Sequence, residues 1–124
     1  MTSDDLACVP EVEIDPDGTF KYVLIKVSTK KPAGGSSNEK IVVRGFRWGA
    51  YHADIFEDTE EKVRKMGLTA KCLGGGRIHH NAAAKQLNVY GYSQGFGKAD
   101  HEQTVQLLKT SYPDYEITWS NSGY

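Results

Sequence analysis

The stretch Thr19-Phe20-Lys21-Tyr22-Val23-Leu24-Ile25-Lys26-Val27-Ser28 organises the fold. β-Branched and aromatic residues dominate it, which is typical of a β-strand. Alternate residues of a strand point to opposite faces, and here both alternating sets are mostly apolar. We therefore expect a central strand of a sheet that is covered on both sides. The preceding Asp15-Pro16-Asp17-Gly18 predicts a turn, because Pro presets φ and Gly accepts a positive φ.

Shorter runs of the same residue types predict further strands on both sides of this stretch. We expect the strand around Arg77–His80 to pair with the strand that begins at Leu87, through the polar turn Asn81–Lys85. The predicted strands are Val9–Ile14, Ile41–Phe46, Arg77–His80, Leu87–Ser93 and Tyr115–Trp119.

Two segments have the apolar and charged faces of amphipathic helices. They are Ala53–Met66, with Gly67 as its C-cap, and Asp100–Lys109, which begins with the capping-box spacing of Asp100 and Gln103. The element order predicts an α/β fold, a mixed β-sheet of about six strands flanked by two α-helices. We expect a single domain over residues 1–124, with a flexible Gly-, Ser- and Pro-rich loop at about 29–40.

The composition limits the classes of partner and the compartment. Lys and Arg number 15 and Asp and Glu number 16, so the net charge is −1. This balance argues against nucleic acid and anionic membranes as partners, although a local basic pocket is compatible with it. The N-terminus has no signal-peptide pattern, and the separate cysteines Cys8 and Cys72 indicate a reducing compartment. We therefore expect a cytoplasmic protein, and nothing requires more than a monomer.

The histidines and cysteines do not have the spacing of a metal site. There is no HExxH motif and no cysteine pair with zinc spacing. The adjacent His79 and His80 would point to opposite faces of a strand, so they would make a poor chelate. We expect neither a metal ion nor another cofactor.

The segment Ser93-Gln94-Gly95-Phe96-Gly97 leads from a predicted strand toward a helix. Its alternating glycines allow backbone N–H groups to converge on one anion, and a helix N-terminus would add positive charge. The hydroxyl of Ser93 offers a further donor. The segment is therefore a candidate phosphate-binding loop, and the alternative is a plain strand-to-helix turn.

His52 stands just ahead of the first predicted helix. The positive end of the helix dipole disfavours an imidazolium there, so the ring should be neutral near pH 7, beside the free N–H of Ala53. A neutral imidazole can act as a base or a nucleophile, whereas the alternative is an ordinary histidine at a helix start. The strand cations Lys21, Arg44 and Arg77 need an anionic partner, either a protein carboxylate or a bound phosphate.

Several motifs stand in the order and spacing of a known family. They are the segments Val12–Ile25, Tyr51–Ile55, Leu73–Ile78, Gly91–Ser93 and Tyr112–Tyr124. On these motifs the chain resembles the phosphohistidine phosphatases, the Janus/ocnus family, over essentially its whole length except the loop from Thr29 to Lys40. The resemblance implies a mixed sheet flanked by two helices. It also implies a protein phosphatase that hydrolyses the P–N bond of phosphohistidine without a metal.

The resemblance also implies roles for individual residues. His52 would be catalytic, as a general base that activates water or as a nucleophile, and the base role is favoured. Gly95 departs from the alanine of the family pattern but keeps a backbone donor. With the N–H of Ala53 added, the expected phosphate-binding residues are Lys21, Arg44, Ala53, Arg77, Ser93, Gln94 and Gly95.

Two other functions would use the same residues. A binding module would recognise phosphohistidine without hydrolysing it, and it would not need His52. An intermediary in phosphoryl transfer would instead hold the phosphoryl group stably on His52. In each case the expected partners are histidine-phosphorylated proteins.

Overall fold

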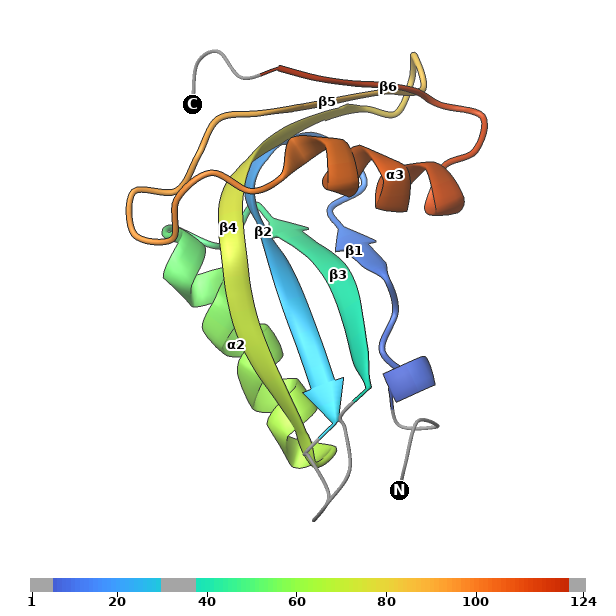
Figure 1. Ribbon diagram of the computed structural model, residues 1–124. Coiled ribbons are helices and arrows are strands. Elements are labelled where there is room, and N and C mark those ends of the chain that lie inside the picture. The colour runs from blue at the N-terminus through green and yellow to red at the C-terminus, as the bar shows by residue number, and fades with distance from the viewer. Residues whose placement is uncertain (1–5, 30–37, 121–124) are drawn as a thin grey trace.

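A six-stranded mixed β-sheet with two helices forms the molecule (Figure 1). The computed structural model describes residues 6–29 and 38–120. The strand order is β1-β3-β2-β4-β5-β6, with parallel pairs at the two edges and antiparallel pairs between them. This confirms the predicted α/β fold. The elements are β1 (Val12–Ile14), β2 (Gly18–Thr29), β3 (Glu39–Phe46), α2 (His52–Lys65), β4 (Leu68–Asn81), β5 (Gln86–Tyr90), α3 (His101–Ser111) and β6 (Glu116–Trp119).

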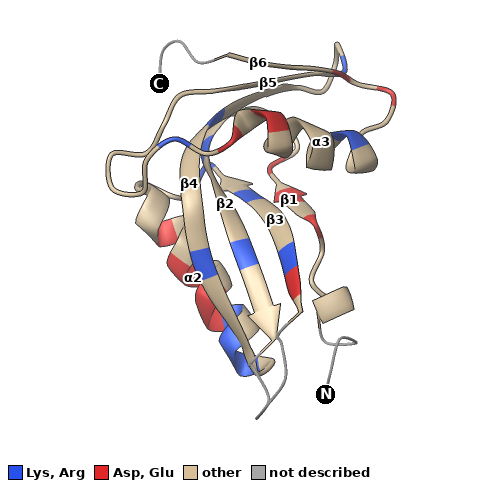
Figure 2. Ribbon diagram, in the orientation of Figure 1, with Lys and Arg blue, Asp and Glu red and all other residues tan. Residues whose placement is uncertain are grey.

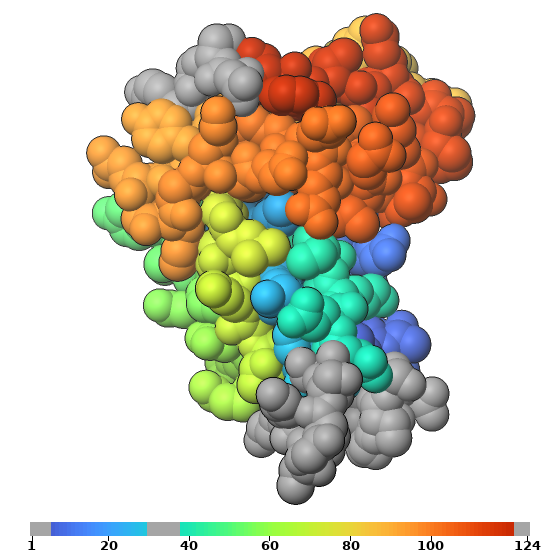
Figure 3. All heavy atoms as spheres, in the orientation of Figure 1, coloured from blue at the N-terminus to red at the C-terminus, as the bar shows by residue number. Residues whose placement is uncertain are grey.

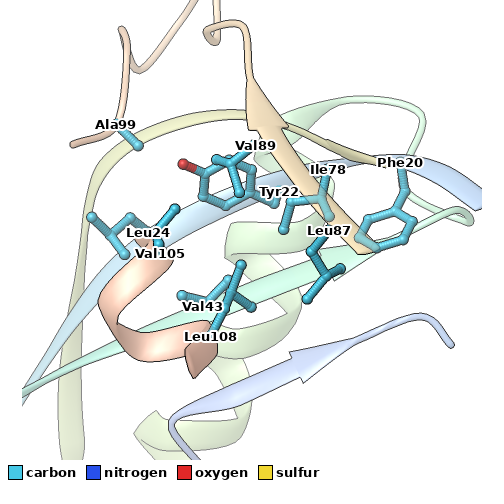
Figure 4. Packing of buried hydrophobic residues seen from close by; sticks show 10 residues of the cluster. All are labelled: Phe20, Tyr22, Leu24, Val43, Ile78, Leu87, Val89, Ala99, Val105 and Leu108. Carbon is cyan, nitrogen blue, oxygen red and sulfur yellow. The ribbon is translucent and has the colours of Figure 1, made fainter. Parts of the chain in front are cut away.

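Strand β2 separates two apolar clusters, as its two apolar faces predicted. Tyr22 and Leu24 pack into the cluster beneath α3 (Figure 4). Val23 and Ile25 point the other way, into the cluster beneath α2. Full burial of one such aliphatic side chain contributes about 1.5–3 kcal/mol, so both clusters stabilise the sheet. The helices therefore cover opposite faces, and each covers a different part of the sheet (Figure 1).

Helix α3 and the segments around it occupy only one end of the face that Figure 3 shows. Below them, the surfaces of β2, β3 and β4 are not covered by a helix (Figure 3). Helix α2 packs on these same three strands from the opposite face. The end of α2 that begins at His52 therefore lies over the middle of the sheet.

The ends of α2 are set by local interactions. The N–H of the N-cap residue Tyr51 donates to the carboxylate of Asp54 over 2.9 Å. At the other end Gly67, at φ 83°, donates its N–H to the carbonyl of Arg64, as a glycine C-cap does. Acidic residues lie along the first part of α2 and basic residues in its last turn, which complements the helix dipole (Figure 2). These interactions place His52 in the first turn of the helix.

Strand β4 is longer than predicted. The sequence predicted a strand only at Arg77–His80, whereas β4 runs from Leu68 to Asn81. The sequence did not predict the part of β4 before Arg77, because the run Gly74–Gly76 has a low strand propensity. The predicted pairing with β5 is confirmed, since Ile78 lies opposite Val89.

Other boundaries differ by a few residues. The first strand begins at Val12, and the strand predicted to reach Ser93 ends at Tyr90, because Gly91 turns the chain at φ 79°. Helix α3 begins after Asp100, whose side chain accepts from the N–H of Gln103 as predicted. Of the loop predicted at about 29–40, the ends belong to β2 and β3, and residues 30–37 lie outside the described residues. Among the described residues, no helix is long and apolar enough to cross a membrane.

Candidate active site

A cleft of about 840 Å³ lies on the α2 side of the sheet, where that helix begins. It is formed by segments that are far apart in the sequence: β2, β4, the start of α2 and the loop after β5. All predicted site residues except Arg44 line it. The lining residues are Lys21, Ala50, Tyr51, His52, Ala53, Arg77, Tyr92, Ser93, Gln94, Gly95 and Phe96.

Two cations form the floor of this cleft. Lys21 of β2 and Arg77 of β4 are directly opposite each other in the antiparallel pairing. Side chains in such a pair start about 5 Å apart, and two like charges there destabilise a sheet. A bound anion would relieve this repulsion. The pair is therefore arranged as a phosphate site would require.

His52 reaches the cleft from the first turn of α2 and is 9% exposed. Its Nε2 lies 2.9 Å from the carbonyl oxygen of Gly76. A carbonyl only accepts, so Nε2 carries the proton of the neutral ring and Nδ1 keeps its lone pair. The ring lies so close to β4 that a Cβ at Gly75 would be 2.7 Å from its Cδ2. Gly75 and Gly76 thus fix both the tautomer and the position of His52.

The surroundings of His52 favour the neutral ring. Burial lowers the pKa of His52, and the positive charges of Lys21 and Arg77 lower it further, against the opposing effect of the hydrogen bond to Gly76. The start of a helix disfavours an imidazolium as well. At neutral pH the ring therefore offers Nδ1 as a base or nucleophile beside two cations.

The Ser93–Gly97 loop is a closed turn. Ser93 and Gly97 exchange backbone hydrogen bonds of 3.1 and 2.8 Å, and Ser93 Oγ accepts from the N–H of Phe96 over 3.1 Å. This leaves the hydroxyl proton of Ser93 for another acceptor. Within the described part of the chain, no hydrogen bond engages the N–H groups of Gln94 and Gly95. These donors fit the role of an anion-binding loop.

The sequence predicted that the helix following this loop would place its N-terminus at the cleft. The structure places the N-terminus of α2 there instead. Helix α3 begins only at His101, after Lys98 has bridged to Gly75 of β4, and no residue of α3 lines the cleft. It is α2 whose first residues do so. The loop is held against α2 by the edge-to-face contact of Phe96 with Phe56, whose ring centroids are 5.7 Å apart.

Arg44 lies outside the cleft. Its guanidinium donates to the carbonyls of Val43 and Pro10 over 2.9 and 2.7 Å, and its Nε lies 3.4 Å from the carboxylate of Glu13. Burial lowers the pKa of Arg44, while Glu13 acts to raise it. The anionic partner that this strand cation needs is therefore a protein carboxylate, and Arg44 ties β3 to β1.

Four lining residues were not among the predicted site residues. Tyr92 stands in the motif segment Gly91–Ser93, and it lines the cleft. Ala50 and Tyr51 directly precede His52, and Phe96 lies in the predicted loop. Tyr51 and Tyr92 belong to the motif segments, and Ala50 and Phe96 lie near motif or loop residues, but neither signal shows which side chains face a cleft.

The remaining histidines lie elsewhere. His79 is exposed and bonds Thr19 Oγ1 through Nδ1 over 2.7 Å. His80 is buried between the carbonyl of Asp15 and the hydroxyl of Tyr115, so the two do point to opposite faces. Among residues 6–29 and 38–120, no three His, Cys, Asp or Glu side chains are grouped to hold a metal ion.

The sequence is similar to known proteins over its whole length. The sequence model of the Janus/Ocnus family matches residues 6–116. The chain is 48% identical to the 14 kDa phosphohistidine phosphatase of Sus scrofa over 121 residues, 97% of this chain and 96% of that protein. It is 47% identical to that of Homo sapiens over the full length of both. It is 56% identical to the sex-regulated protein janus-A of Drosophila yakuba, over 100% of this chain and 88% of that protein. The resemblance is thereby confirmed, and the chain belongs to the Janus/Ocnus family.

Proposed function

We propose that this protein is a phosphohistidine phosphatase that hydrolyses the P–N bond of phosphohistidine in proteins, without a metal. The observation that carries the proposal is the neutral His52, whose Nδ1 lone pair is held beside Lys21 and Arg77 in one cleft. The names of the pig and human relatives support the same class of reaction. The two cations and the His52 ring, which is hydrogen-bonded to the carbonyl of Gly76, explain how such a reaction would proceed.

The phosphoryl group would sit over the cation pair. Phosphoryl transfer passes through a loose transition state in which the charge spreads over three equatorial oxygens. Preorganised donors around those oxygens stabilise that charge. The donors are the side chains of Lys21, Arg77 and Ser93 and the N–H groups of Ala53, Gln94 and Gly95.

His52 would act as the general base. A water oxygen attacks phosphorus in line with the P–N bond and gives a proton to Nδ1 of His52. The P–N bond breaks, and a substrate imidazole that is protonated on its other nitrogen leaves as neutral histidine. Nε2 keeps its proton throughout, because Gly76 accepts its hydrogen bond. Lys21 and Arg77 disfavour the imidazolium of His52, so the proton returns to solvent readily.

The nucleophile role predicts a different intermediate. If Nδ1 of His52 attacked phosphorus itself, His52 would become phosphorylated before water released the phosphate. Rapid acid-free quenching followed by mass spectrometry would detect this species during turnover. Its absence at a time when product is forming supports the base role.

Substitution of His52 tests the proposal. His52→Ala should lower the hydrolysis of a histidine-phosphorylated protein by roughly 10²–10⁴-fold, the usual contribution of acid–base catalysis. His79→Ala is the matched control, because His79 is an exposed histidine outside the cleft. Wild-type activity in His52→Ala would refute the proposal. Purified protein that binds phosphohistidine without turnover would identify a binding module instead, and loss of activity in a chelator would indicate a metal.

We also propose that the protein acts as a cytoplasmic monomer. The two cysteines are free thiols in the structure, with Cys8 exposed, and this supports a reducing compartment. Analytical ultracentrifugation tests the oligomeric state, and microscopy of the tagged chain tests the location.

A further inference from the structure

The loop Arg47–Tyr51 between β3 and α2, here the β3–α2 loop, exposes two large aromatic side chains. Trp48 is 55% exposed and Tyr51 is 71% exposed. Tyrosine and tryptophan of this exposure commonly mark surfaces that bind another molecule. Arg47 is exposed as well. Arginine, tryptophan and tyrosine are the residue types most enriched where alanine substitution weakens protein–protein binding most.

The β3–α2 loop is held in one conformation. Trp48 stacks on Phe46 of β3, with ring centroids 5.3 Å apart and planes 12° apart. A Cβ at Gly49 would collide with the side chain of Ile55, so the loop packs tightly on α2. The N–H of Arg47 donates to the carboxylate of Asp15 over 2.6 Å. A loop that is already ordered loses little conformational entropy when it binds a partner.

The β3–α2 loop is continuous with the cleft. Ala50 and Tyr51 line the cleft directly. Phe46, on which Trp48 stacks, lies opposite Lys21 in the β2–β3 pairing, and Arg77 lies opposite Lys21 on its other side. Cross-strand neighbours are about 5 Å apart, so Trp48 is within reach of residues that flank a phosphohistidine bound at Lys21.

Arg47 adds an exposed charge to the β3–α2 loop. Its side chain lies over Gly18, where an added Cβ would be 3.4 Å from Cδ of Arg47. No carboxylate in residues 6–29 and 38–120 forms an ion pair with its guanidinium. An acidic side chain of a partner would therefore meet an exposed cation here.

We propose that the β3–α2 loop is the docking surface for the polypeptide that carries the phosphohistidine. An apolar side chain of the substrate would pack on Trp48, and an acidic one would pair with Arg47. The inference rests on the proposed function and deepens it, because it makes polypeptides better substrates than small phosphoramidates. It assigns substrate preference to residues outside the group that contacts phosphate.

Two substrates separate docking from chemistry. One is a synthetic peptide with a single phosphohistidine between leucine and glutamate, and the other is phosphoramidate. Trp48→Ala should raise KM and lower kcat/KM for the peptide by about tenfold or more, as for a central interface tryptophan. Hydrolysis of phosphoramidate should not change, and Trp48→Phe should restore most of the peptide activity. Arg47→Glu should weaken binding of the same peptide. It should not weaken binding of a version that has glutamine in place of glutamate.

Trp119→Ala is the matched control. Trp119 of β6 is also exposed, at 43%, but it is not a residue of the cleft, so both substrates should be hydrolysed normally. Unchanged peptide kinetics in Trp48→Ala would overturn the proposal. Equal losses on peptide and phosphoramidate would also overturn it, because they indicate a structural role. If the wild type hydrolyses neither substrate, the proposed function fails. Equilibrium binding of the same peptide to wild type and Trp48→Ala then shows whether the β3–α2 loop is the docking surface.

Discussion

Replacing Gly75 with alanine should displace the His52 ring without removing any charged group. The new Cβ would lie 2.7 Å from Cδ2 of His52, 2.9 Å from the backbone oxygen of Tyr22 and 3.1 Å from Cβ of Ser93. The backbone of β2 is fixed by pairing on both sides. Relief of the contact with Tyr22 requires a small local shift of β4, and relief of the contact with His52 requires the ring to move, which breaks its hydrogen bond to Gly76.

The size of the effect follows from these distances. Nonbonded carbons rest about 3.5–4.0 Å apart, so the ring must shift by roughly 0.8–1.3 Å. A displacement of about 1 Å in a reacting group lowers a rate by about 10²-fold. Overpacking of this kind also destabilises a folded protein by about 1–3 kcal/mol. We therefore expect a folded, somewhat less stable variant with about a hundredfold lower kcat on phosphohistidine.

The assay compares two alanine substitutions at glycines of the site. Gly95→Ala is the control, because no atom lies within 4 Å of its added Cβ, and it should retain activity. Urea unfolding of both variants measures stability separately from the initial rates of phosphate release. Full activity in Gly75→Ala, or an equal loss in Gly95→Ala, would refute the idea that the close approach of β4 positions His52.

Two other substitutions test the cations. Lys21→Gln should lower kcat/KM by about 10–100-fold, as loss of a charged hydrogen bond of about 1.5–3 kcal/mol does. It should also shift the acid limb of the pH profile to higher pH, because a cation that lowers the pKa of His52 is gone, and an unshifted limb would contradict the proposed proximity. Arg44→Met should lower the free energy of unfolding in urea by about 1–3 kcal/mol, since two backbone carbonyls lose their donor. Its activity on phosphoramidate should be normal, and a selective loss of activity would place Arg44 in the site after all.

Local patterns predicted the elements that carry the site. The two apolar faces of the Thr19–Ser28 stretch predicted the central strand, and the caps predicted both helices to within a few residues. The position of His52 at a helix start predicted a neutral ring. Each of these properties depends on neighbours in the sequence, so the sequence is enough to derive it.

The predictions from sequence that failed concern contacts between distant segments. The Gly74–Gly76 run has low strand propensity, yet β4 is continuous there, and His52 packs against it from outside the strand. Arg44 and Arg77 are both arginines of predicted strands. Arg44 contacts Glu13 and Pro10, whereas Arg77 lines the cleft. Nothing local distinguishes them, because the partner of each comes from another strand.

The order of residues alone is enough to derive a mixed sheet with two helices and the motifs that hold the candidate chemistry. It does not reveal that Lys21 and Arg77 stand opposite each other under His52, or that Trp48 and Tyr51 face solvent beside them. These features emerge only in the folded chain. Strand periodicity and helix caps are short-range properties, whereas the pairing register and the burial of a side chain depend on segments that meet only when the chain folds.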